Sequence, residues 1–292
     1  MKPGNDCLSC IRKQAERTLR LGVEEKSEAV LSPQAEQNAL LEVDTLLSNP
    51  TEYLTPAELA FQVQRILCRH TGVEDPFLRY RQDSNQAALK LLPQLGEKIR
   101  SSRDPLQTAA LIAAAGASFD FACERSEGLE GAIERIERQG FARSDFEKFR
   151  EELGQVTALL YLADNAGEIV FDRLFLATLK EQYPGVEITV AVNRCPMLNS
   201  ALRRDALEAG LEACGEILDK GYDGAGTVLA QAGDDFQLAF STSDIILSKG
   251  EANFQTLQQR PDTLYFLLQA GCKTMAEALN VQPGDAVFLR SY

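Results

Sequence analysis

The first half of the chain is patterned for helices. Up to about residue 150, apolar residues recur every three or four positions, and no segment there has the pattern of a strand. The clearest helix start is Thr55-Pro56-Ala57-Glu58, a capping box with proline at the first helical position, and Gly72 is expected to end that helix. Three further helices are expected, the first of them kinked or ended by Pro93, and they begin at Asp75-Pro76, Asp104-Pro105 and Ser144 with Glu147.

Short apolar runs alternate with amphipathic segments in the second half. The run from Val156 to Leu162 fits a strand buried on both faces, and Glu168 to Gln182 fits the helix that follows it. The same alternation predicts strands over residues 186–192, 215–218, 245–247, 263–268 and 286–289, with helices over residues 199–210, 234–241, from 252 and 275–279. We therefore predict an α/β fold. A largely parallel, Rossmann-like sheet forms a three-layer αβα domain over residues 151–292, preceded by an all-helical region over residues 1–150.

Composition excludes several classes of function. The 292 residues include 43 acidic and 30 basic side chains, a net charge of −13, and so acidic a chain without a basic run is not expected to bind nucleic acid. No apolar stretch approaches the roughly 20 residues of a membrane span, and no signal segment is visible, so we expect a cytoplasmic protein without membrane contact. Seven cysteines in such a chain indicate reduced thiols, and the single histidine, His70, argues against a histidine-rich zinc site.

Polar residues gather where four of the predicted strands end. In parallel sheets, ligands bind beyond the carboxyl ends of the strands, so these residues are expected to meet at one edge. They are Asp164, Asn165 and Glu168 after the first strand, Asn193, Arg194, Asn199 and Asp205 after the second, Asp219 and Lys220 after the third, and Ser248, Lys249 and Asn253 after the fourth.

The first of these turns has the chemistry of a phosphate site. Asp164 and Asn165 offer two hard oxygen donors that suit Mg²⁺ or Mn²⁺, and Gly167 lets the backbone approach a ligand closely. The N–H groups and the dipole at the start of the next helix favour a bound phosphate. However, Asp-Asn after a strand is also an ordinary helix cap, Lys249 an ordinary turn lysine and Asp205 an ordinary surface charge. These residues alone predict a phosphate site and no particular reaction.

Three ordered motifs resemble the damage-control phosphatase family, metal-dependent phosphatases first catalogued as a domain of unknown function. Asp164 to Glu168 is the family's Asp-Asn-Ala-Gly-Glu turn, intact. Pro196 to Asn199 with Asp205-Ala206 resembles its second motif, and Asp244 to Asn253 its third. Further matches extend the resemblance over essentially the whole chain: Gly226-Thr227, the stretch Cys272 to Val287, Asp75-Pro76-Phe77, and Cys7-Leu8-Ser9-Cys10, which is typical of the microbial branch.

The resemblance implies a metal-dependent phosphatase that hydrolyses small phosphomonoesters, such as sugar phosphates or damaged phosphometabolites. It implies that Asp164, Asn165 and Asp205 hold a divalent metal, Mn²⁺ or Mg²⁺, with Co²⁺ or Ni²⁺ as alternatives. Lys249 is expected to contact the phosphate, and Glu168 to position water, so that these two and Asp164 form the catalytic set. The other substrate-binding residues, some of which reach over the cleft from the helical region, are expected to be Asn199, Gly167, Asn253, Arg81, Asn85 and Asp120.

Several alternatives stay open from the sequence. The nucleophile is either a metal-activated water or the carboxylate of Asp164. The chain could instead be an S-adenosylmethionine-dependent carboxyl methyltransferase, which the single glycine after the first strand disfavours, or a metal-binding protein without catalysis. Neither the native metal nor the oligomeric state is predicted. Four departures from the family pattern indicate a shifted specificity or a weakened activity: Ser200, Ala117, Asn193-Arg194 and Gly271.

Cys7 and Cys10 lie three residues apart, on one face of a predicted helix. A structural zinc site would need two further ligands, and no second such pair exists. A thioredoxin-like role would need a strand before the helix, and none is predicted. We therefore expect the two thiols to pack against other helices, with a metal or redox role as the alternative.

Overall fold

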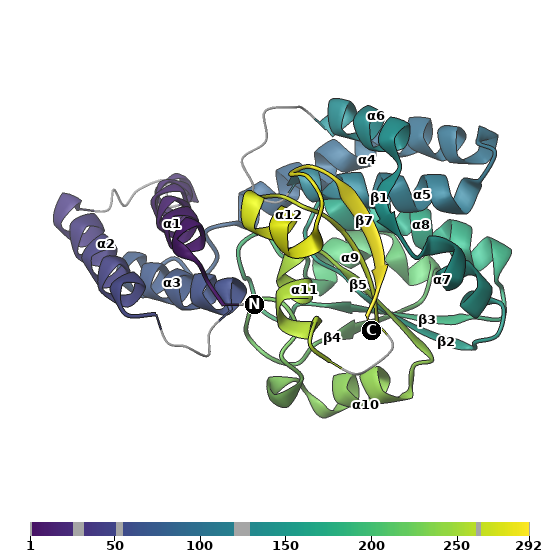
Figure 1. Ribbon diagram of the computed structural model, residues 1–292. Coiled ribbons are helices and arrows are strands. Elements are labelled where there is room, and N and C mark those ends of the chain that lie inside the picture. Colours follow the sequence, from purple (N-terminus) through teal and green to yellow (C-terminus); the bar gives the residue numbers. More distant parts are fainter. Residues whose placement is uncertain (1, 26–31, 51–54, 120–128, 261–263, 292) are drawn as a thin grey trace.

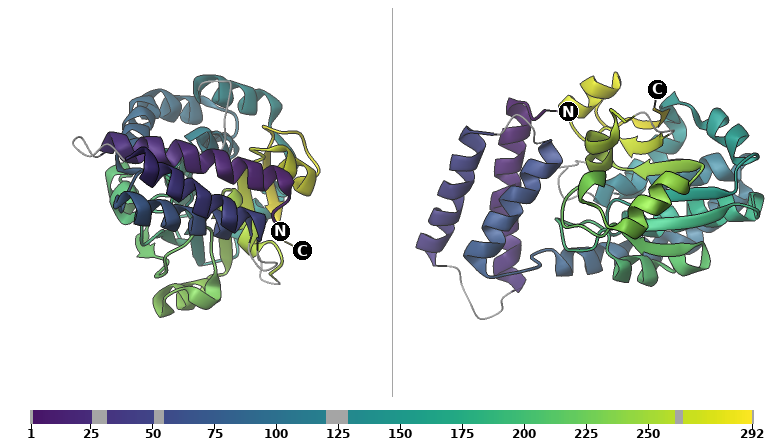
Figure 2. Two further views of the ribbon diagram at one scale, coloured as in Figure 1. Left: turned by 90° about the vertical axis from the view of Figure 1, so that its left-hand side faces the viewer. Right: turned by 90° about the horizontal axis from the view of Figure 1, so that it is seen from below.

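The N-terminal helices form a bundle beside the rest of the molecule. The computed structural model describes residues 2–25, 32–50, 55–119, 129–260 and 264–291. In it, α1 (Asn5–Glu25), α2 (Pro33–Ser48) and α3 (Pro56–Thr71) lie side by side (Figure 1 and Figure 2). They share one hydrophobic cluster, which Met197 and Ala225 from the second half also join. The bundle is therefore tied to the rest of the chain by apolar contacts.

Both ends of α3 lie where the sequence predicts them. Thr55 Oγ1 accepts a hydrogen bond from Glu58 N (3.2 Å), and Thr55 N donates one to Glu58 Oε2 (2.8 Å), which completes the capping box. Gly72 ends the helix with φ at 62°, in the left-handed region that favours glycine. Local signals are sufficient to define this helix.

Replacing Thr55 with alanine is expected to lower the free energy of unfolding by about 1 kcal/mol, because the N–H of Glu58 loses its acceptor. Chemical denaturation followed by circular dichroism measures the change. Thr55→Ser keeps a hydroxyl at this position and should stay close to the wild type. Equal stability of the alanine and serine variants would mean that the cap contributes nothing.

The described part of the second half is built on one sheet. Its strand order is β1-β7-β6-β5-β2-β3-β4, and the five strands from β6 to β4 run parallel. β7 is antiparallel to β6, and β1 pairs parallel with β7. This confirms the predicted α/β fold, with one reversed pair at an edge. The strands are β1 (Phe141–Ser144), β2 (Ala158–Leu162), β3 (Glu187–Val192), β4 (Glu216–Asp219), β5 (Ile245–Lys249), β6 (Leu264–Gln269) and β7 (Ala286–Arg290).

One expectation about the first half is wrong, and one of two alternatives is excluded. β1 is a strand before residue 150, and it was missed because its four residues are mostly exposed and show no apolar alternation; its pairing with β7 is a long-range contact. Pro93 does not end its helix either, because α4 (Leu78–Ser101) continues past it. Ala88 and Leu95 pack in the core on the two sides of Pro93, which offsets the hydrogen bond that proline cannot make.

Helices cover both faces of the sheet. Successive side chains of β2 point to opposite faces of the sheet. Leu159 and Tyr161 belong to the hydrophobic cluster on one face, and Leu160 and Leu162 belong to the cluster on the other. The first cluster lies under α4, α5 (Pro105–Ala115), α6 (Leu129–Gln139), α7 (Phe146–Leu153), α8 (Glu168–Gln182) and α9 (Arg203–Ala209). The second lies under α10 (Asp234–Thr242), α11 (Glu251–Leu257) and α12 (Lys273–Leu279).

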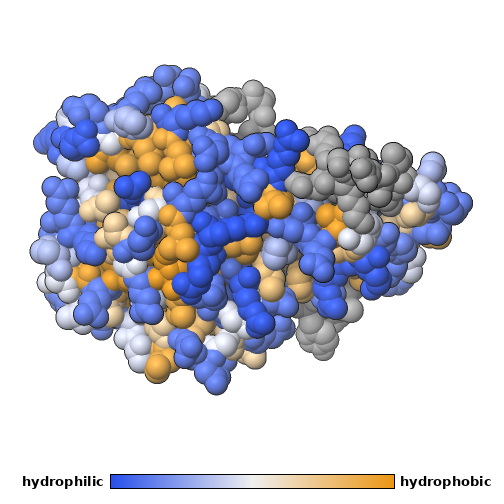
Figure 3. Space-filling model, turned by 180° about the vertical axis from the view of Figure 1, so that it is seen from behind, coloured by the Kyte–Doolittle hydropathy of each residue, from blue (hydrophilic) through white to orange (hydrophobic). Residues whose placement is uncertain are grey.

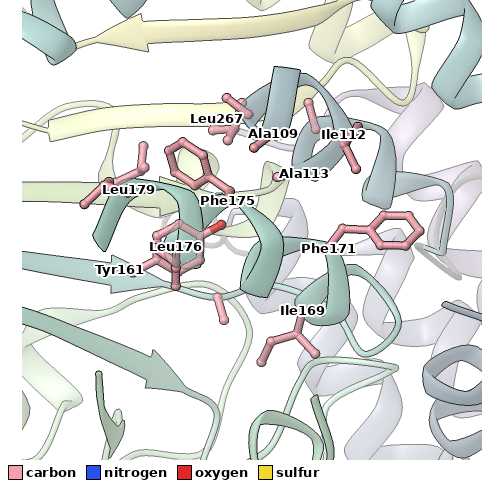
Figure 4. Packing of buried hydrophobic residues seen from close by; sticks show 14 of the residues in the cluster. Ala109, Ile112, Ala113, Tyr161, Ile169, Phe171, Phe175, Leu176, Leu179 and Leu267 are labelled. Carbon is pink, nitrogen blue, oxygen red and sulfur yellow. The ribbon is translucent and has the colours of Figure 1, made fainter. Parts of the chain in front are cut away.

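α8 is a central helix of the first layer, and it carries the candidate site at its start. Phe171, Phe175 and Leu176 of α8 are fully buried; Phe175 lies near Leu267 and Tyr161 of the sheet, whereas Phe171 points away from the strands (Figure 4) and packs against Phe119. The helices α4 to α6, which precede residue 151, and α7, which crosses it, share this core with the sheet. The predicted division at residue 150 therefore falls inside one hydrophobic core, and of the described helices before that residue α1 to α3 have a cluster apart from it.

None of the helices within the described ranges has both the length and the apolar character of a membrane span. The face opposite to that of Figure 1 is largely hydrophilic, with hydrophobic patches over the α/β part (Figure 3). Large apolar side chains that are exposed include Leu41, Leu207 and Leu238, which lie on three different helices and form no single surface.

Candidate active site

Asn165 is the centre of the turn between β2 and α8. Its Nδ2 donates hydrogen bonds to Asp164 Oδ2 (3.0 Å) and to Glu168 Oε2 (3.2 Å). Because the amide nitrogen faces these carboxylates, the amide oxygen of Asn165 is directed away from them. Gly167 has φ at 79°, and a Cβ there would lie 2.6 Å from the ring of Phe119, so the turn requires glycine. The turn thus fixes an amide beside a carboxylate.

Lys249, at the end of β5, is fully buried behind this turn. Its Nζ donates to Glu168 Oε1 (2.6 Å), Asp172 Oδ1 (2.6 Å) and the carbonyl oxygen of Ala113 (3.1 Å). An ammonium group has three N–H donors, and these three acceptors match them. The sequence predicts that Lys249 contacts phosphate, whereas in this structure its charge is directed at two carboxylates inside the protein.

Asp172 is a buried member of this cluster that the sequence reasoning missed. It lies one helical turn after Glu168 on α8, and that four-residue spacing could have indicated it. Burial raises the pKa of Asp172 to about 6, against the opposing effect of Lys249. Burial alone would lower the pKa of Lys249, but Asp172 and Glu168 outweigh it and raise that pKa above its ordinary value. The cluster therefore holds one cation between two carboxylates.

Asp205 lies at the start of α9 and is 1% exposed. It accepts hydrogen bonds from Asn85 Nδ2 (2.9 Å) and from the backbone N–H of Leu202 (2.8 Å), and Arg81 Nε lies 3.8 Å from it. Burial raises the pKa of Asp205, and the contacts to Leu202, Arg81 and Asn85 oppose that shift. Asn85 Oδ1 also accepts from Gly167 N (2.7 Å), so Asn85 joins Asp205 to the Asp164 turn.

The backbone of the turn is also held from outside. Ala166 N donates to the carbonyl oxygen of Asn199 (2.9 Å), just as Gly167 N donates to Asn85. Asn199 is buried, and its Nδ2 donates to the carbonyl oxygen of Phe119 (2.9 Å). The N–H groups of Ala166 and Gly167, which the sequence predicts to meet phosphate, are thus bonded within the protein.

Lys220, beyond the end of β4, is a second buried cation near the turn, and the sequence reasoning gave it no role. Its Nζ donates to the carbonyl oxygen of Gly226 (3.1 Å) and to Asn253 Oδ1 (3.1 Å). Burial lowers the pKa of Lys220 to about 8, although the Asp164 carboxylate acts against the shift. Asn253 Nδ2 donates to the carbonyl oxygens of Lys249 (2.8 Å) and Ala163 (3.3 Å), so Asn253 ties three strand ends together.

A cavity of about 180 Å³ opens beside the turn, between the N-terminal bundle and the sheet. Of the predicted metal ligands, Asp164 and Asn165 line it. The other predicted residues are not among its lining: Asp205, Glu168, Lys249, Arg81, Asn85, Asn199, Gly167 and Asn253 lie outside it, and Asp120 is outside the described residues. Of the predicted site residues, the structure therefore presents one carboxylate and one amide to the cavity, whose lining also includes Asp6, Gln14, Glu251, Gln255 and Lys273.

Three cysteines line the same cavity: Cys7 and Cys10 from α1, and Cys272 from the start of α12. Cys7 is half-buried and Cys10 is exposed, so the expectation that both pack against helices is wrong for Cys10. The pKa of Cys272 is raised to about 11, mainly by burial and to a smaller extent by the carboxylate of Glu251. That thiol is therefore protonated at neutral pH.

The chemistry of the donors fits a hard divalent ion. A carboxylate and an amide oxygen are ligands that Mg²⁺ and Mn²⁺ accept. A Cβ at Gly250 would overlap Asp164 Oδ2, so the missing side chain of that glycine makes room for the carboxylate. In the parts of the chain that are described, no three His, Cys, Asp or Glu side chains are grouped to hold a metal. A metal site at this turn therefore needs the amide oxygen of Asn165 as one of its ligands.

Comparison with known proteins identifies the family. Residues 4–287 match the damage-control phosphatase ARMT1-like domain. The chain belongs to this family. A damage-control phosphatase of Pyrococcus horikoshii is 28% identical to it over 294 residues, which cover 100% of this chain and 99% of the relative. A damage-control phosphatase of Archaeoglobus fulgidus is 28% identical over 294 residues, 98% of each chain.

A solved structure agrees with this assignment. The crystal structure of a duf89 family protein from Pyrococcus horikoshii matches with a TM-score of 0.86 and 27% identity, over 100% of both chains. The damage-control phosphatase fold therefore extends over the bundle and the sheet alike. Membership of this family supports a phosphatase role, as the resemblance in the sequence implies. The roles of individual residues stay predictions.

Proposed function

We propose that this damage-control phosphatase family member hydrolyses small phosphomonoesters with the help of a divalent metal. The observation that carries the proposal is the position of Asp164 and Asn165, which line the cavity and are fixed to each other by a hydrogen bond. A substrate in the cavity would meet these two donors. Mn²⁺ or Mg²⁺ suits them best, with Co²⁺ or Ni²⁺ as alternatives.

Asp164 and Asn165 would hold the metal, and Asp205 would complete the set through the link that Asn85 provides. A bound divalent ion supplies positive charge to the phosphate oxygens, which offsets the acidity of this chain. A carboxylate retains lone pairs for further ligands when it accepts one hydrogen bond at each oxygen. The bonds that Asp205 makes are therefore compatible with this role.

Lys249 would act on the reaction through Glu168. Its ammonium group holds Glu168 Oε1, and Glu168 Oε2 in turn holds the amide of Asn165. This chain of hydrogen bonds fixes the rotamer of Asn165, and therefore the direction of its amide oxygen. We propose that Lys249 positions the ligands in this way. Direct contact between Lys249 and phosphate, which the sequence predicts, would require the ammonium group to leave its present partners.

Chelation tests the proposal directly. Prolonged treatment with EDTA, followed by its removal, is expected to abolish hydrolysis of a panel of phosphomonoesters, because Asp164 and Asn165 alone bring no positive charge to the phosphate. Mn²⁺, Mg²⁺, Co²⁺ and Ni²⁺, added back one at a time, should restore it to different extents, as measured by phosphate release. Full activity in the treated, metal-free protein would refute metal dependence.

A further inference from the structure

Ser200 lies next to the Asp164 turn, in the segment between β3 and α9. It forms an antiparallel bridge with Asn165, and Ala201 N donates a hydrogen bond to the carbonyl oxygen of Asp164 (2.8 Å), which holds this pairing in register. Two residues that face each other in an antiparallel pair carry their side chains on the same face, with Cβ atoms about 4.5–5.5 Å apart. The side chain of Ser200 therefore starts beside that of Asn165.

Three oxygen donors consequently meet at one wall of the cavity, because Asp164, Asn165 and Ser200 all line it. Ser200 is half-buried, and no described residue exchanges a hydrogen bond with its Oγ. A hydroxyl oxygen has two lone pairs, and a serine hydroxyl is an ordinary Mg²⁺ ligand in the loops that bind nucleoside triphosphates. The hydroxyl of Ser200 is therefore available to a hard cation beside the carboxylate and the amide.

Two carboxylates that line the same cavity, those of Asp6 and Glu251, are placed differently. Asp6 is exposed in the first turn of α1, and Glu251 Oε1 accepts a hydrogen bond from Gly271 N (2.6 Å). Ser200, in contrast, is paired through its backbone with the turn that carries the proposed metal ligands. Asp205, at the start of α9, is 1% exposed and lies outside the lining. On the cavity side, the oxygen donor that this segment offers is therefore Ser200.

We infer that Ser200 is a neutral metal ligand and that it limits the metal affinity of this site. The inference rests on the proposed function and deepens it by naming a further ligand. A carboxylate at position 200 would place a second negative charge next to Asp164, whereas serine adds an oxygen without charge. Because the attraction between a divalent ion and its ligands scales with the charge of those ligands, the site binds its metal less tightly than an acidic residue would allow. Its reaction therefore depends on a higher concentration of free metal.

Mn²⁺ titration calorimetry on EDTA-treated protein tests the inference without any substrate. Ser200→Asp is expected to lower the Kd for Mn²⁺ about tenfold or more, and Ser200→Ala to raise it about threefold or more, because the first adds a charge and the second removes an oxygen. Ser241→Asp is the matched control, since it adds the same charge on α10, at an exposed position outside the cavity, and should bind as the wild type does. In the absence of metal, Ser200→Asp should melt below the wild type because Asp164 repels the new carboxylate, and Mn²⁺ should raise its Tm by more.

The possible results separate the ligand role from the function on which it rests. An unchanged Kd in both Ser200 variants, with Mn²⁺ bound by the wild type, would overturn the inference and leave the metal-dependent function intact. An equal gain in affinity for Ser200→Asp and Ser241→Asp would do the same, because it would show an effect of net charge alone. Absence of Mn²⁺ binding in the wild type and in Ser200→Asp alike would overturn both. If Ser200→Asp does not fold, Ser200→Ala, which adds no charge, decides the inference by its Kd.

Discussion

Asp164→Ala is expected to lower kcat/KM for phosphomonoesters by at least about two to three orders of magnitude while the protein stays folded. Asp164 lies at the edge of the cavity, outside the three hydrophobic clusters, so the core does not depend on it. Two of the proposed metal ligands are carboxylates, and of these Asp164 lines the cavity whereas Asp205 does not. The substitution therefore removes the negatively charged ligand at the cavity. Phosphate release, Mn²⁺ titration calorimetry and thermal melting measure the three consequences. Wild-type metal affinity in the variant would exclude Asp164 from the site.

Asp205→Ala provides the contrast. Asp205 is 1% exposed and accepts hydrogen bonds from Asn85 and from the N–H of Leu202. Its loss leaves the N–H of Leu202 without this acceptor and Asn85 Nδ2 with Glu208 Oε2 alone, and it takes one of two carboxylates from the buried Arg81, which keeps Asp75. This variant should therefore lose both metal affinity and thermal stability, whereas Asp164→Ala should lose affinity alone. Asp164→Asn, which keeps the shape and removes the charge, should resemble Asp164→Ala in activity.

The elements that were predicted correctly are those whose ends are marked by residues next to them in the sequence. The predicted bounds of α8, Glu168 to Gln182, are those of the structure, because a strand, a turn with an obligatory glycine and an amphipathic run follow one another directly. The cap of α3 and the N-cap of α5 at Asp104 are equally local. The parallel order from β2 to β6 follows from the alternation of strands and helices, and only β7 and β1, whose direction depends on long-range pairing, depart from it.

The parts of the site that could not be predicted depend on tertiary contacts. Lys249 and Asp172 are 77 residues apart, and although the spacing of Asp172 from Glu168 could place both on one face of α8, no local signal shows that Lys249 is buried against them. Asn85 and Asp205 are 120 residues apart, and their bond requires α4 to pack beside α9. The residues alone left Lys249 either as an ordinary solvated turn lysine or as a cation of the site, and its phosphate contact was implied by the resemblance to the family. Burial, which the sequence does not reveal, changes what its charge can reach.

Lys249→Met is the variant that tests this cluster, and it is expected to lower the free energy of unfolding by about 3–5 kcal/mol at pH 8. The substitution leaves Glu168 and Asp172 buried without their cation. Turnover should fall as well, because Glu168 no longer holds the amide of Asn165 in place. Urea denaturation and phosphate release measure the two effects. If Lys249 instead contacts only phosphate, turnover should fall while the urea midpoint stays at its wild-type value.

The pH dependence of stability separates these outcomes further. The pKa of Asp172 in the folded wild type, about 6, already lies above the ordinary value of 3.8, so its contribution to stability is present below pH 3.8 and is lost as the pH rises through 6. Without Lys249 the folded pKa of Asp172 rises further, because the effect of burial loses its main opponent. The stability deficit of Lys249→Met should therefore be smaller at pH 5 than at pH 8. Adding Asp172→Asn, which removes one uncompensated charge, should recover part of it at pH 8. A deficit that is equal at both pH values and unaffected by Asp172→Asn would mean that the carboxylates do not depend on Lys249.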